Sequence, residues 1–491
     1  MTVRADRIAF SLQDLYCELP SVNELLLTEA VQILLISHSR NAVVRACRNA
    51  LEEIRGEIAA GMQPRETLLI RIQALPQSIE RALNQIPLYS LRSVINATGV
   101  LLHTNLGRAP LSRKALEHMV EIGSGYSNLE FELERGERGQ RDIHVEALLL
   151  SLLGGAADSG KGGKPHRAIV VNNCAAATFL ALHALAKGRE VLVSRGELVE
   201  IGGGFRIPEI LQESGALLRE VGTTNRTHLA DYERAVSPNT ALILRVHQSN
   251  FSMDGFVERP TLEELVALGS RMNIPVFEDQ GTGLVESLEP HGIFGEPTIA
   301  KSVGSGCDLI AASGDKLLGG PQCGILVGNK PLVEAIRRDP LFRTYRADKL
   351  NYAALEATLQ QYLAEASEEI PVLRMLAITG QELEIRCAQM ADAIQNHELT
   401  TQVIAVESVV GGGTTPKARL KSFAVSLTHA AFNTDALLRA LRVLVRPVIG
   451  RIEDDRVLLD LRTVEPGDDA YLIDALSKLT KADAPPLRGQ N

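Results

Sequence analysis

The amino-acid sequence predicts an α/β protein whose main part is a mostly parallel sheet covered by helices on both faces. From about residue 90 to 350, short apolar runs alternate with helical stretches, as in RAIVVNN, then AAATFLALHALAKG, then REVLVS. Such alternation is typical of strand–helix–strand units, which build parallel sheets. The 491 residues are enough for about three domains. We therefore predict a small helical N-terminal domain over residues 1–75, the sheet domain over 76–350, and a smaller α+β domain over 351–491.

Helical signals fill the N-terminal segment. Ser21 precedes an apolar run and Glu24 follows three residues later, which is the pattern of a capping box at a helix start. The stretch NAVVRACRNALEEIRGEI then repeats apolar residues at helical spacing. The arginines in and just before it are Arg40, Arg45, Arg48 and Arg55. They could line a basic face, but the neighbouring glutamates favour an ordinary solvated helix face.

The C-terminal part combines helices with a few strands. Residues 350–400 are predicted to be strongly helical, and KSFAVSL, TDALLRALR and RVLLDLRTV then read as strand, helix and strand before a last helix. This order predicts a compact α+β layer. Earlier in the chain, GGAADSGKGGKP at 154–165 is rich in glycine and lysine, which is typical of a flexible surface insertion.

Composition excludes several classes of protein. The formal net charge of −9 gives no general basic surface for nucleic acid, so an RNA partner would need a local patch. No apolar run reaches the roughly 18 residues of a membrane span, and the N-terminus has no apolar core of a secretory signal. The six cysteines are scattered, without C-x-x-C pairs or metal-type spacing. We expect a cytoplasmic protein with no membrane partner and no metal site.

One lysine stands in an unusual setting. Lys316 lies between two predicted strands, CDLIAAS and CGILVG, in a turn with several glycines. Glycines allow the backbone to approach other groups closely, which an exposed lysine does not require. A lysine held tightly at a strand end could do chemistry with its amine. A surface lysine in an ordinary hairpin is the alternative, and this stretch alone does not decide between them.

Polar groups after other predicted strands favour the reactive lysine. Ligands of open α/β sheets bind at the carboxyl ends of the strands. After VVNN, the small residues Cys174 and Ala175 open a helix next to Asn173, and a helix N-terminus free of bulky side chains suits an anion. Asp279 ends the apolar run IPVF-Glu-Asp, and Ser313 ends LIAAS. An anion site, a carboxylate and Ser-x-x-Lys thus follow one another along the chain.

This set of residues fits pyridoxal phosphate chemistry. Lys316 would form the Schiff base, and Asp279 would keep the ring nitrogen protonated. The helix start at Asn173, Cys174 and Ala175 would hold the phosphate together with Ser313. Glu278 competes for the carboxylate role, since neighbours on a strand face opposite ways. Asp279 is preferred because it lies at the very end of the apolar run.

Several long motifs carry a resemblance to a known family. They are INATGVLLHTNLGRAPLS, YSNLEFELERGERGQRD, ELVEIGGGFRIPEILQESGALLREVGTTNRT, HQSNFSMDGF and SGDKLLGGPQCGI. Over about residues 20–465 the chain closely resembles bacterial selenocysteine synthases, the L-seryl-tRNA(Sec) selenium transferases. The resemblance implies a pyridoxal-phosphate fold-type-I domain, similar to aspartate aminotransferase, and a helical N-terminal domain that binds tRNA. It also implies a large ring-shaped homo-oligomer built from dimers.

The resemblance further implies a reaction and residues for it. Enzymes of this family convert L-seryl-tRNA(Sec) to L-selenocysteinyl-tRNA(Sec) with selenophosphate, through an aminoacrylate bound to the cofactor. By position, the Schiff-base lysine is Lys316, and Asp315 before it would assist proton delivery to the leaving hydroxyl. The anion-binding arginines, which would take selenophosphate, are Arg108, Arg343 and Arg346. Arg343 and Arg346 are three residues apart, so both could grip one phosphate-like anion.

The sequence departs from the family at a few places and leaves two other functions open. Asn172-Asn173-Cys174 stands where the family usually has a run of asparagines, so the family's phosphate contacts do not carry over directly at these positions. A pyridoxal-phosphate-dependent lyase of small amino acids is one alternative, but the N-terminal domain argues against it. A non-catalytic RNA-binding protein is the other, and Lys316 with Asp279 argues against that.

Overall fold

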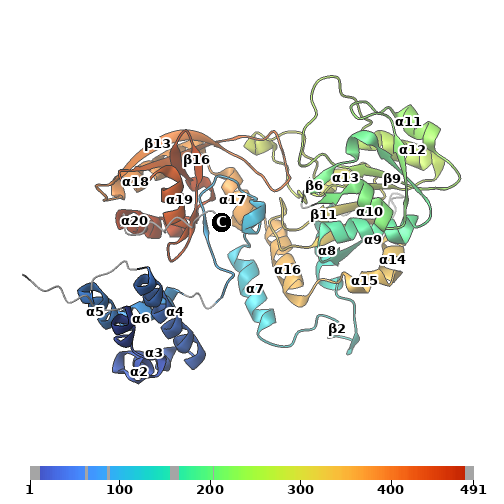
Figure 1. Ribbon diagram of the computed structural model, residues 1–491. Coiled ribbons are helices and arrows are strands. Elements are labelled where there is room, and N and C mark those ends of the chain that lie inside the picture. Colours follow the sequence, from blue (N-terminus) through green and yellow to red (C-terminus); the bar gives the residue numbers. More distant parts are fainter. Residues whose placement is uncertain (1–11, 61–64, 86–88, 155–164, 203, 481–491) are drawn as a thin grey trace, which may run out of the picture. The chain divides into compact units, whose positions relative to one another are not determined.

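The structure is a computed structural model that describes residues 12–60, 65–85, 89–154, 165–202 and 204–480 (Figure 1). The predicted insertion at 154–165 lies almost wholly outside the described residues. The chain divides into two compact units, Met1–Ser93 and Val94–Asn491. Each unit is described by itself below.

The N-terminal unit is a bundle of helices around a core of its own. Its helices are α1 (Leu12–Cys17), α2 (Val22–Leu27), α3 (Glu29–Ser37), α4 (Arg40–Ala59), α5 (Arg65–Gln73) and α6 (Leu75–Gln85). The predicted capping box is present at α2, where Ser21 Oγ accepts from the Glu24 amide at 3.2 Å and Glu24 Oε2 from the Ser21 amide at 2.6 Å. Ile79 and Leu83 of α6 pack into the core, so the unit continues past the predicted boundary at residue 75.

The second unit contains a seven-stranded sheet in the order β4-β12-β11-β10-β9-β5-β8. The strands are β4 (His166–Val171), β5 (Glu190–Ser194), β8 (Leu217–Val221), β9 (Thr240–Val246), β10 (Val276–Asp279), β11 (Leu309–Ser313) and β12 (Gly324–Asn329). Neighbours pair in parallel except at β12, which runs antiparallel to both β4 and β11. The sheet is therefore mostly parallel, as predicted.

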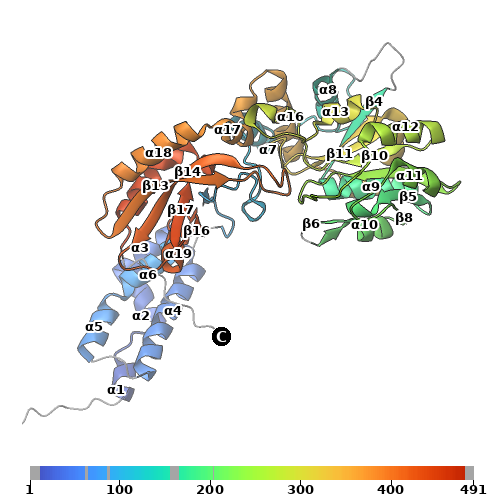
Figure 2. The same ribbon diagram turned by 90° about the horizontal axis from the view of Figure 1, so that it is seen from above.

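Helices cover both faces of this sheet (Figure 2). One face packs against α9 (Cys174–Ala186), α10 (Ile207–Glu213) and α14 (Lys330–Arg338). The other packs against α8 (Ile143–Leu152), α11 (Leu229–Ala235), α12 (Leu262–Met272), α13 (Ile299–Gly304), α16 (Lys349–Leu363) and α17 (Pro371–Ala377). Side chains of one strand alternate between the two cores: Ile169 and Val171 join the first, Ala168 and Val170 the second.

A smaller α+β layer completes this unit. Its four-stranded sheet has the order β13-β14-β17-β16, formed by β13 (Leu399–Ser408), β14 (Leu420–His429), β17 (Arg456–Asp460) and β16 (Arg451–Glu453). Its helices are α18 (Gly380–Ala393), α19 (Thr434–Arg442) and α20 (Asp469–Ser477). Apart from Ile95 and Ala97, the buried core of this layer begins with Leu383, whereas Leu355 and Val372 belong to the larger sheet's core. The continuous part of the layer thus starts about thirty residues after the predicted boundary at 351, because residues before Leu383 pack in the other core.

Short elements connect these layers. β1 (Ile95–Asn96) pairs in parallel with β15 (Val448–Ile449), so the start of the unit belongs to the smaller layer. The α-helices and strands not yet given are α7 (Arg113–Gly123), α15 (Leu341–Thr344), and the hairpins β2 (Phe131–Glu132) with β3 (Glu137–Arg138) and β6 (Glu200–Gly202) with β7 (Phe205–Arg206).

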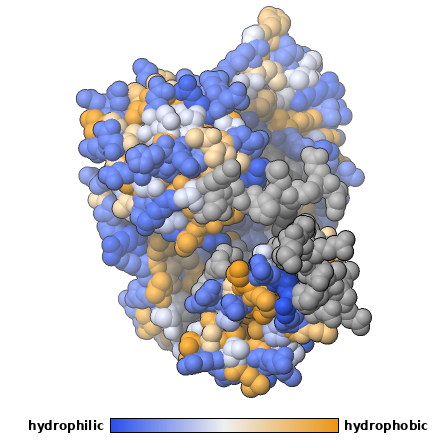
Figure 3. Space-filling view, turned by 60° about the vertical axis from the view of Figure 1, so that its left-hand side comes forward, coloured by the Kyte–Doolittle hydropathy of each residue, from blue (hydrophilic) through white to orange (hydrophobic). Residues whose placement is uncertain are grey.

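Apolar side chains lie among polar ones on the face drawn in Figure 3. Within the described residues, no single helix is long and apolar enough to cross a membrane. One bent pair, Leu15–Leu27 with Glu29–Ser37, reaches the necessary length and composition.

Candidate active site

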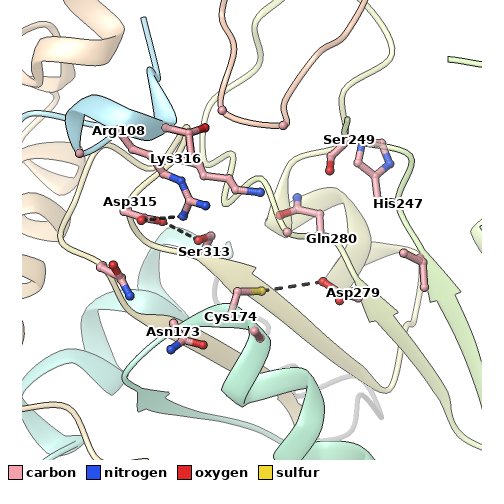
Figure 4. A pocket seen from close by; sticks show the side chains of 18 residues that line it. Arg108, Asn173, Cys174, His247, Ser249, Asp279, Gln280, Ser313, Asp315 and Lys316 are labelled. Carbon is pink, nitrogen blue, oxygen red and sulfur yellow. Dashed lines mark hydrogen bonds and ion pairs between the residues drawn. The ribbon is translucent and has the colours of Figure 1, made fainter. Parts of the chain in front are cut away.

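A cavity of about 560 Å³ lies at the carboxyl end of the seven-stranded sheet (Figure 4). Residues that follow β4, β9, β10 and β11 line it, together with two loops from elsewhere in the unit. This is where open α/β sheets bind their ligands. The lining includes every predicted site residue except Arg343 and Arg346.

Lys316 lies in the connection between β11 and β12, with only 6% of its surface exposed. The glycines around it permit close packing: a Cβ atom at Gly314 would lie 2.4 Å from Cys323 Sγ. Burial lowers the pKa of Lys316 below its usual value, and the nearby Arg108 charge lowers it further. A neutral amine is the form that acts as nucleophile or base. The turn therefore holds a lysine suited to chemistry rather than a surface lysine.

β10 ends in two acidic residues that face opposite sides of the sheet. Asp279 lines the cavity and accepts a hydrogen bond from Thr178 Oγ1 at 3.0 Å. Glu278 lines a different cavity, of about 290 Å³. Burial raises the pKa of Asp279 to about 6, because a charged carboxylate is poorly solvated there. Asp279 is thus the carboxylate that shares a cavity with Lys316.

The N-terminus of α9 forms another wall. Asn173 caps the helix, and its Oδ1 accepts from the Ala176 amide at 2.8 Å. The first amides of a helix have no partner within it and carry the positive end of its dipole. Cys174 and Ala175, which supply such amides, both line the cavity. A Cβ atom at Gly324 would lie 2.1 Å from the Asn173 carbonyl oxygen, so glycine is required for β12 to pass this helix start.

The Cys174 thiol stays neutral in this position. Burial raises its pKa well above the usual value, and the Asp279 carboxylate adds to the effect. Its Sγ lies 3.8 Å from Asp279 Oδ1, to which it donates. Cys174 therefore contacts the carboxylate that faces Lys316, in addition to opening the helix.

Arg108, Asp315 and Ser313 form a connected group at the other side of the cavity (Figure 4). Arg108 Nη1 donates to Asp315 Oδ2 at 2.8 Å, and Ser313 Oγ donates to Asp315 Oδ1 at 2.7 Å. Asp315 therefore accepts from both neighbours. The Ser313 hydroxyl, predicted to bind phosphate, gives its hydrogen to Asp315 in this structure.

The structure does not bring Arg343 and Arg346 into the cavity of this chain. Arg343 is exposed on α15. Arg346 Nη1 lies 3.7 Å from Glu130 Oε1, and its guanidinium lies 6.0 Å from the centre of the Phe342 ring. Their predicted role in binding selenophosphate thus stays a prediction.

Several lining residues were not found from the sequence. They are Thr104, Gly107, Val246, His247, Ser249, Gln280, Gly281, Gln322, Gly412 and Gly413. The position of HQSN directly after the apolar run ALILRV could have indicated His247, by the rule used for Asp279. His247 Nε2 lies 2.9 Å from Glu296 Oε1, with which it shares a hydrogen bond.

Comparison with known proteins identifies the family. The family model of L-seryl-tRNA selenium transferase matches residues 94–465, and the model of the selenocysteine synthase N terminal matches residues 18–55. The chain belongs to the L-seryl-tRNA selenium transferase family. An L-seryl-tRNA(Sec) selenium transferase of Geobacter metallireducens is 45% identical over 470 residues, which are 95% of this chain and 99% of that one. One of Aquifex aeolicus is 43% identical over 440 residues, 89% of this chain and 94% of that one.

Solved structures agree on the fold. The structure of a D-glucosaminate-6-phosphate ammonia-lyase superposes with a TM-score of 0.54 at 19% identity, over 81% of this chain and 98% of that one. This chain has the predicted fold type I of pyridoxal-phosphate enzymes. Its cofactor is pyridoxal 5′-phosphate, as also predicted.

The residues of the cavity fit this cofactor. A buried amine, a buried carboxylate and a helix N-terminus are the groups that its aldehyde, its ring nitrogen and its phosphate require. The space between the first two is kept free by Gly281, where a Cβ atom would lie 3.8 Å from Asp279 Oδ1 and 4.0 Å from Lys316 Nζ. Its φ of +71° also favours glycine.

Proposed function

We propose that this chain converts L-seryl-tRNA(Sec) to L-selenocysteinyl-tRNA(Sec), with selenophosphate as the selenium donor. The observation that carries the proposal is the cavity in which buried Lys316 and Asp279 face one another, within a chain of the L-seryl-tRNA selenium transferase family. Pyridoxal 5′-phosphate, when bound, supplies an electron-accepting ring that stabilises negative charge on the substrate's α-carbon. The roles of the residues follow from their positions.

Lys316 and Asp279 are the residues proposed to accept and to hold protons during the reaction. Lys316 would hold the cofactor through Nζ, and its neutral amine, once released, would accept the proton from the α-carbon of the seryl group. Asp279 would keep a proton on the ring nitrogen of the bound cofactor through its negative charge. The amides of Cys174 and Ala175, with Asn173 as cap, bind the phosphate group.

Arg108 and Asp315 are placed for the second half of the reaction. We assign to Arg108 the binding of the anionic selenium donor, since a guanidinium can form paired hydrogen bonds with phosphate oxygens. Asp315 holds Arg108 in place at 2.8 Å and is positioned to pass a proton to the leaving hydroxyl. Arg343 and Arg346 are proposed as further donor-binding groups by the family resemblance alone.

The N-terminal unit is proposed to bind the tRNA. Arg40, Arg45 and Arg48 are exposed along α4 and form no ion pair with other described residues, unlike Arg55, which pairs with Glu52 at 3.3 Å. Free guanidinium groups on one helix suit the phosphates of an RNA backbone. A local group of arginines of this kind would allow RNA binding in spite of the overall charge of −9.

Removal of residues 1–93 is expected to weaken binding of seryl-tRNA(Sec) at least about tenfold, because the phosphate contacts are lost. The absorbance of the bound cofactor should not change, since every residue that lines the cavity follows residue 93. A mobility-shift titration of the full and shortened chains at one fixed salt concentration measures the effect. Equal affinity of the two chains would contradict a tRNA-binding role for this unit.

Two further properties are proposed, a cytoplasmic location and a large homo-oligomer built from dimers. All six cysteines are free thiols, which suits a reducing compartment. Leu116, Val120 and Tyr126, on and after α7, are exposed in the single chain, with Tyr126 fully so. Apolar side chains of this kind suit contact with another copy. Native mass measurement tests the assembly.

A spectroscopic titration tests the function directly. The near-ultraviolet and visible absorbance of the holoenzyme is followed while seryl-tRNA(Sec), and separately free L-serine, is added. A change with the charged tRNA alone is expected for the transferase. A change with free serine and none with tRNA would instead indicate a small-molecule lyase, and no cofactor absorbance at all would indicate a non-catalytic RNA-binding protein.

A further inference from the structure

A second hollow, of about 390 Å³, adjoins the catalytic cavity. Three segments and Arg259 line it; the segments are the one after β9 up to Met253, the turn 292–296, and residues 415–418 before β14. His247 lines both cavities. The glycine-rich segment 411–418 also joins them, because Gly412 and Gly413 line the catalytic cavity and Thr415 lines the hollow.

The lining of this hollow combines aromatic, cationic and hydrogen-bonding groups. Phe251 and Phe294 supply rings, and Phe294 is 74% exposed. Arg259 and Lys417 supply positive charge. Among the described residues, Arg259 forms no ion pair, whereas Lys417 pairs with Asp254. An exposed ring and a guanidinium without an ion-pair partner, lining one hollow, are groups that bind a nucleotide, through stacking on the base and contact with phosphate.

A buried hydroxyl points to a polar ligand. Thr415 is only 7% exposed, yet its Oγ1 has no hydrogen-bond partner in the described part of the chain. Its φ is +43°, an unfavourable value for a residue with a Cβ atom, so the backbone here is strained. An unpartnered buried hydroxyl costs free energy unless a ligand supplies the missing hydrogen bond.

We propose that this hollow binds the 3′-terminal adenosine of the aminoacylated RNA. The inference rests on the proposed function, in which the reacting serine is esterified to the terminal ribose. When the seryl group reaches Lys316, the ribose and its base must lie in space directly adjoining the catalytic cavity. The hollow adjoins that cavity at His247, and its volume of about 390 Å³ falls within the range of about 300–1,000 Å³ found for small-molecule sites. The adenine stacks on Phe294, the hydroxyl of Thr415 bonds to a polar atom of the nucleoside, and Arg259 contacts the preceding phosphate.

The experiment compares two probes on the full-length holoenzyme. One is 3′-deoxy-3′-(L-serylamino)adenosine, a stable amide analogue of the RNA terminus, and the other is L-serinamide, which lacks the nucleoside. Equilibrium binding of each is measured from the absorbance change of the bound cofactor. Wild type is expected to bind the adenosine probe more tightly. Phe294→Ala should weaken that binding about 5- to 100-fold, the range for loss of base stacking, and leave serinamide binding unchanged.

Phe256→Ala is the matched control. Phe256 is 73% exposed but lines neither cavity, so its removal should affect neither probe. The proposal is overturned if wild type prefers serinamide or binds both probes equally. It is also overturned if Phe294→Ala binds the adenosine probe like wild type, or if both variants weaken it by the same factor. Conversion of seryl-tRNA(Sec) by wild type distinguishes these results from failure of the proposed function, which would abolish that conversion.

Discussion

Replacement of Lys316 with alanine is expected to lower turnover of seryl-tRNA(Sec) by at least about 10⁴-fold. The variant loses both the covalent attachment of the cofactor and the base that accepts the α-proton, and a general base alone contributes about 10²- to 10⁴-fold. Formation of selenocysteinyl-tRNA(Sec), measured with labelled selenium at saturating RNA, checks the rate. The loss of the absorbance band that depends on the lysine checks the attachment.

The same variant should fold and bind tRNA as wild type does. Lys316 is buried and its pKa is lowered, so the substitution removes a desolvated amine. Asp315 keeps its ion pair with Arg108, and Asp279 keeps the hydrogen bond from the Thr178 hydroxyl. Neither carboxylate is therefore left without a partner. Lys330→Ala, at a half-buried lysine whose Nζ lies 3.8 Å from Glu334 Oε1, serves as control and should retain full turnover. Turnover within tenfold of wild type would refute the role of Lys316, as would loss of tRNA binding with the fold intact.

The strands that position the site could be predicted because each is a short apolar run buried on both faces. IPVFED, CDLIAAS and CGILVG correspond to β10, β11 and β12, and the order of their polar ends along the chain places Asp279 and Lys316 at one edge of the sheet. The direction of β12 is not encoded in its own apolar pattern. The short glycine turn after β11 returns the chain beside that strand, and such a turn requires antiparallel pairing.

Contacts between distant segments are the part that sequence reasoning could not supply. Gly412 and Gly413 reach the cavity from the smaller layer, and nothing in their own neighbourhood indicates where that layer packs. Arg346 is another such case, because the sequence spacing from Arg343 suggested an anion site, whereas only the fold shows that Glu130 lies beside Arg346. The choice between Glu278 and Asp279 was open from the sequence, since strand alternation gives two faces without saying which carries the site.

Replacement of Asp279 with asparagine is expected to lower turnover about 10²- to 10³-fold, the usual loss when one electrostatic group of a catalytic centre is removed. Asparagine keeps the shape and can still accept the hydrogen bond from Thr178, but it has no negative charge to hold a proton on the ring nitrogen. Glu278→Gln is a closely matched control, because this neighbouring carboxyl is also buried, at 4% exposure, but lines the other cavity. Equal losses of turnover in the two variants would contradict the proposed role of Asp279, because only Asp279 lines the cavity that contains Lys316.

Asp279→Asn, which lowers turnover, should raise the stability of the cofactor-free protein. Burial raises the pKa of Asp279 from 3.8 to about 6, so the native state binds a proton more tightly than the unfolded chain does. Wild type therefore loses stability as the pH rises from about 4 to about 6, by ~3 kcal/mol at 1.36 kcal/mol per pKa unit, and the asparagine variant does not. We expect the cofactor-free variant to melt at a higher temperature than wild type at pH 8, with the difference in stability reduced to about a third at pH 4.5. A variant that is less stable than wild type at pH 8 would contradict this. Asp279 thus lowers the stability of the cofactor-free protein and is nevertheless needed for turnover. The fold retains this carboxylate because its negative charge would pair with the protonated ring nitrogen of the bound cofactor.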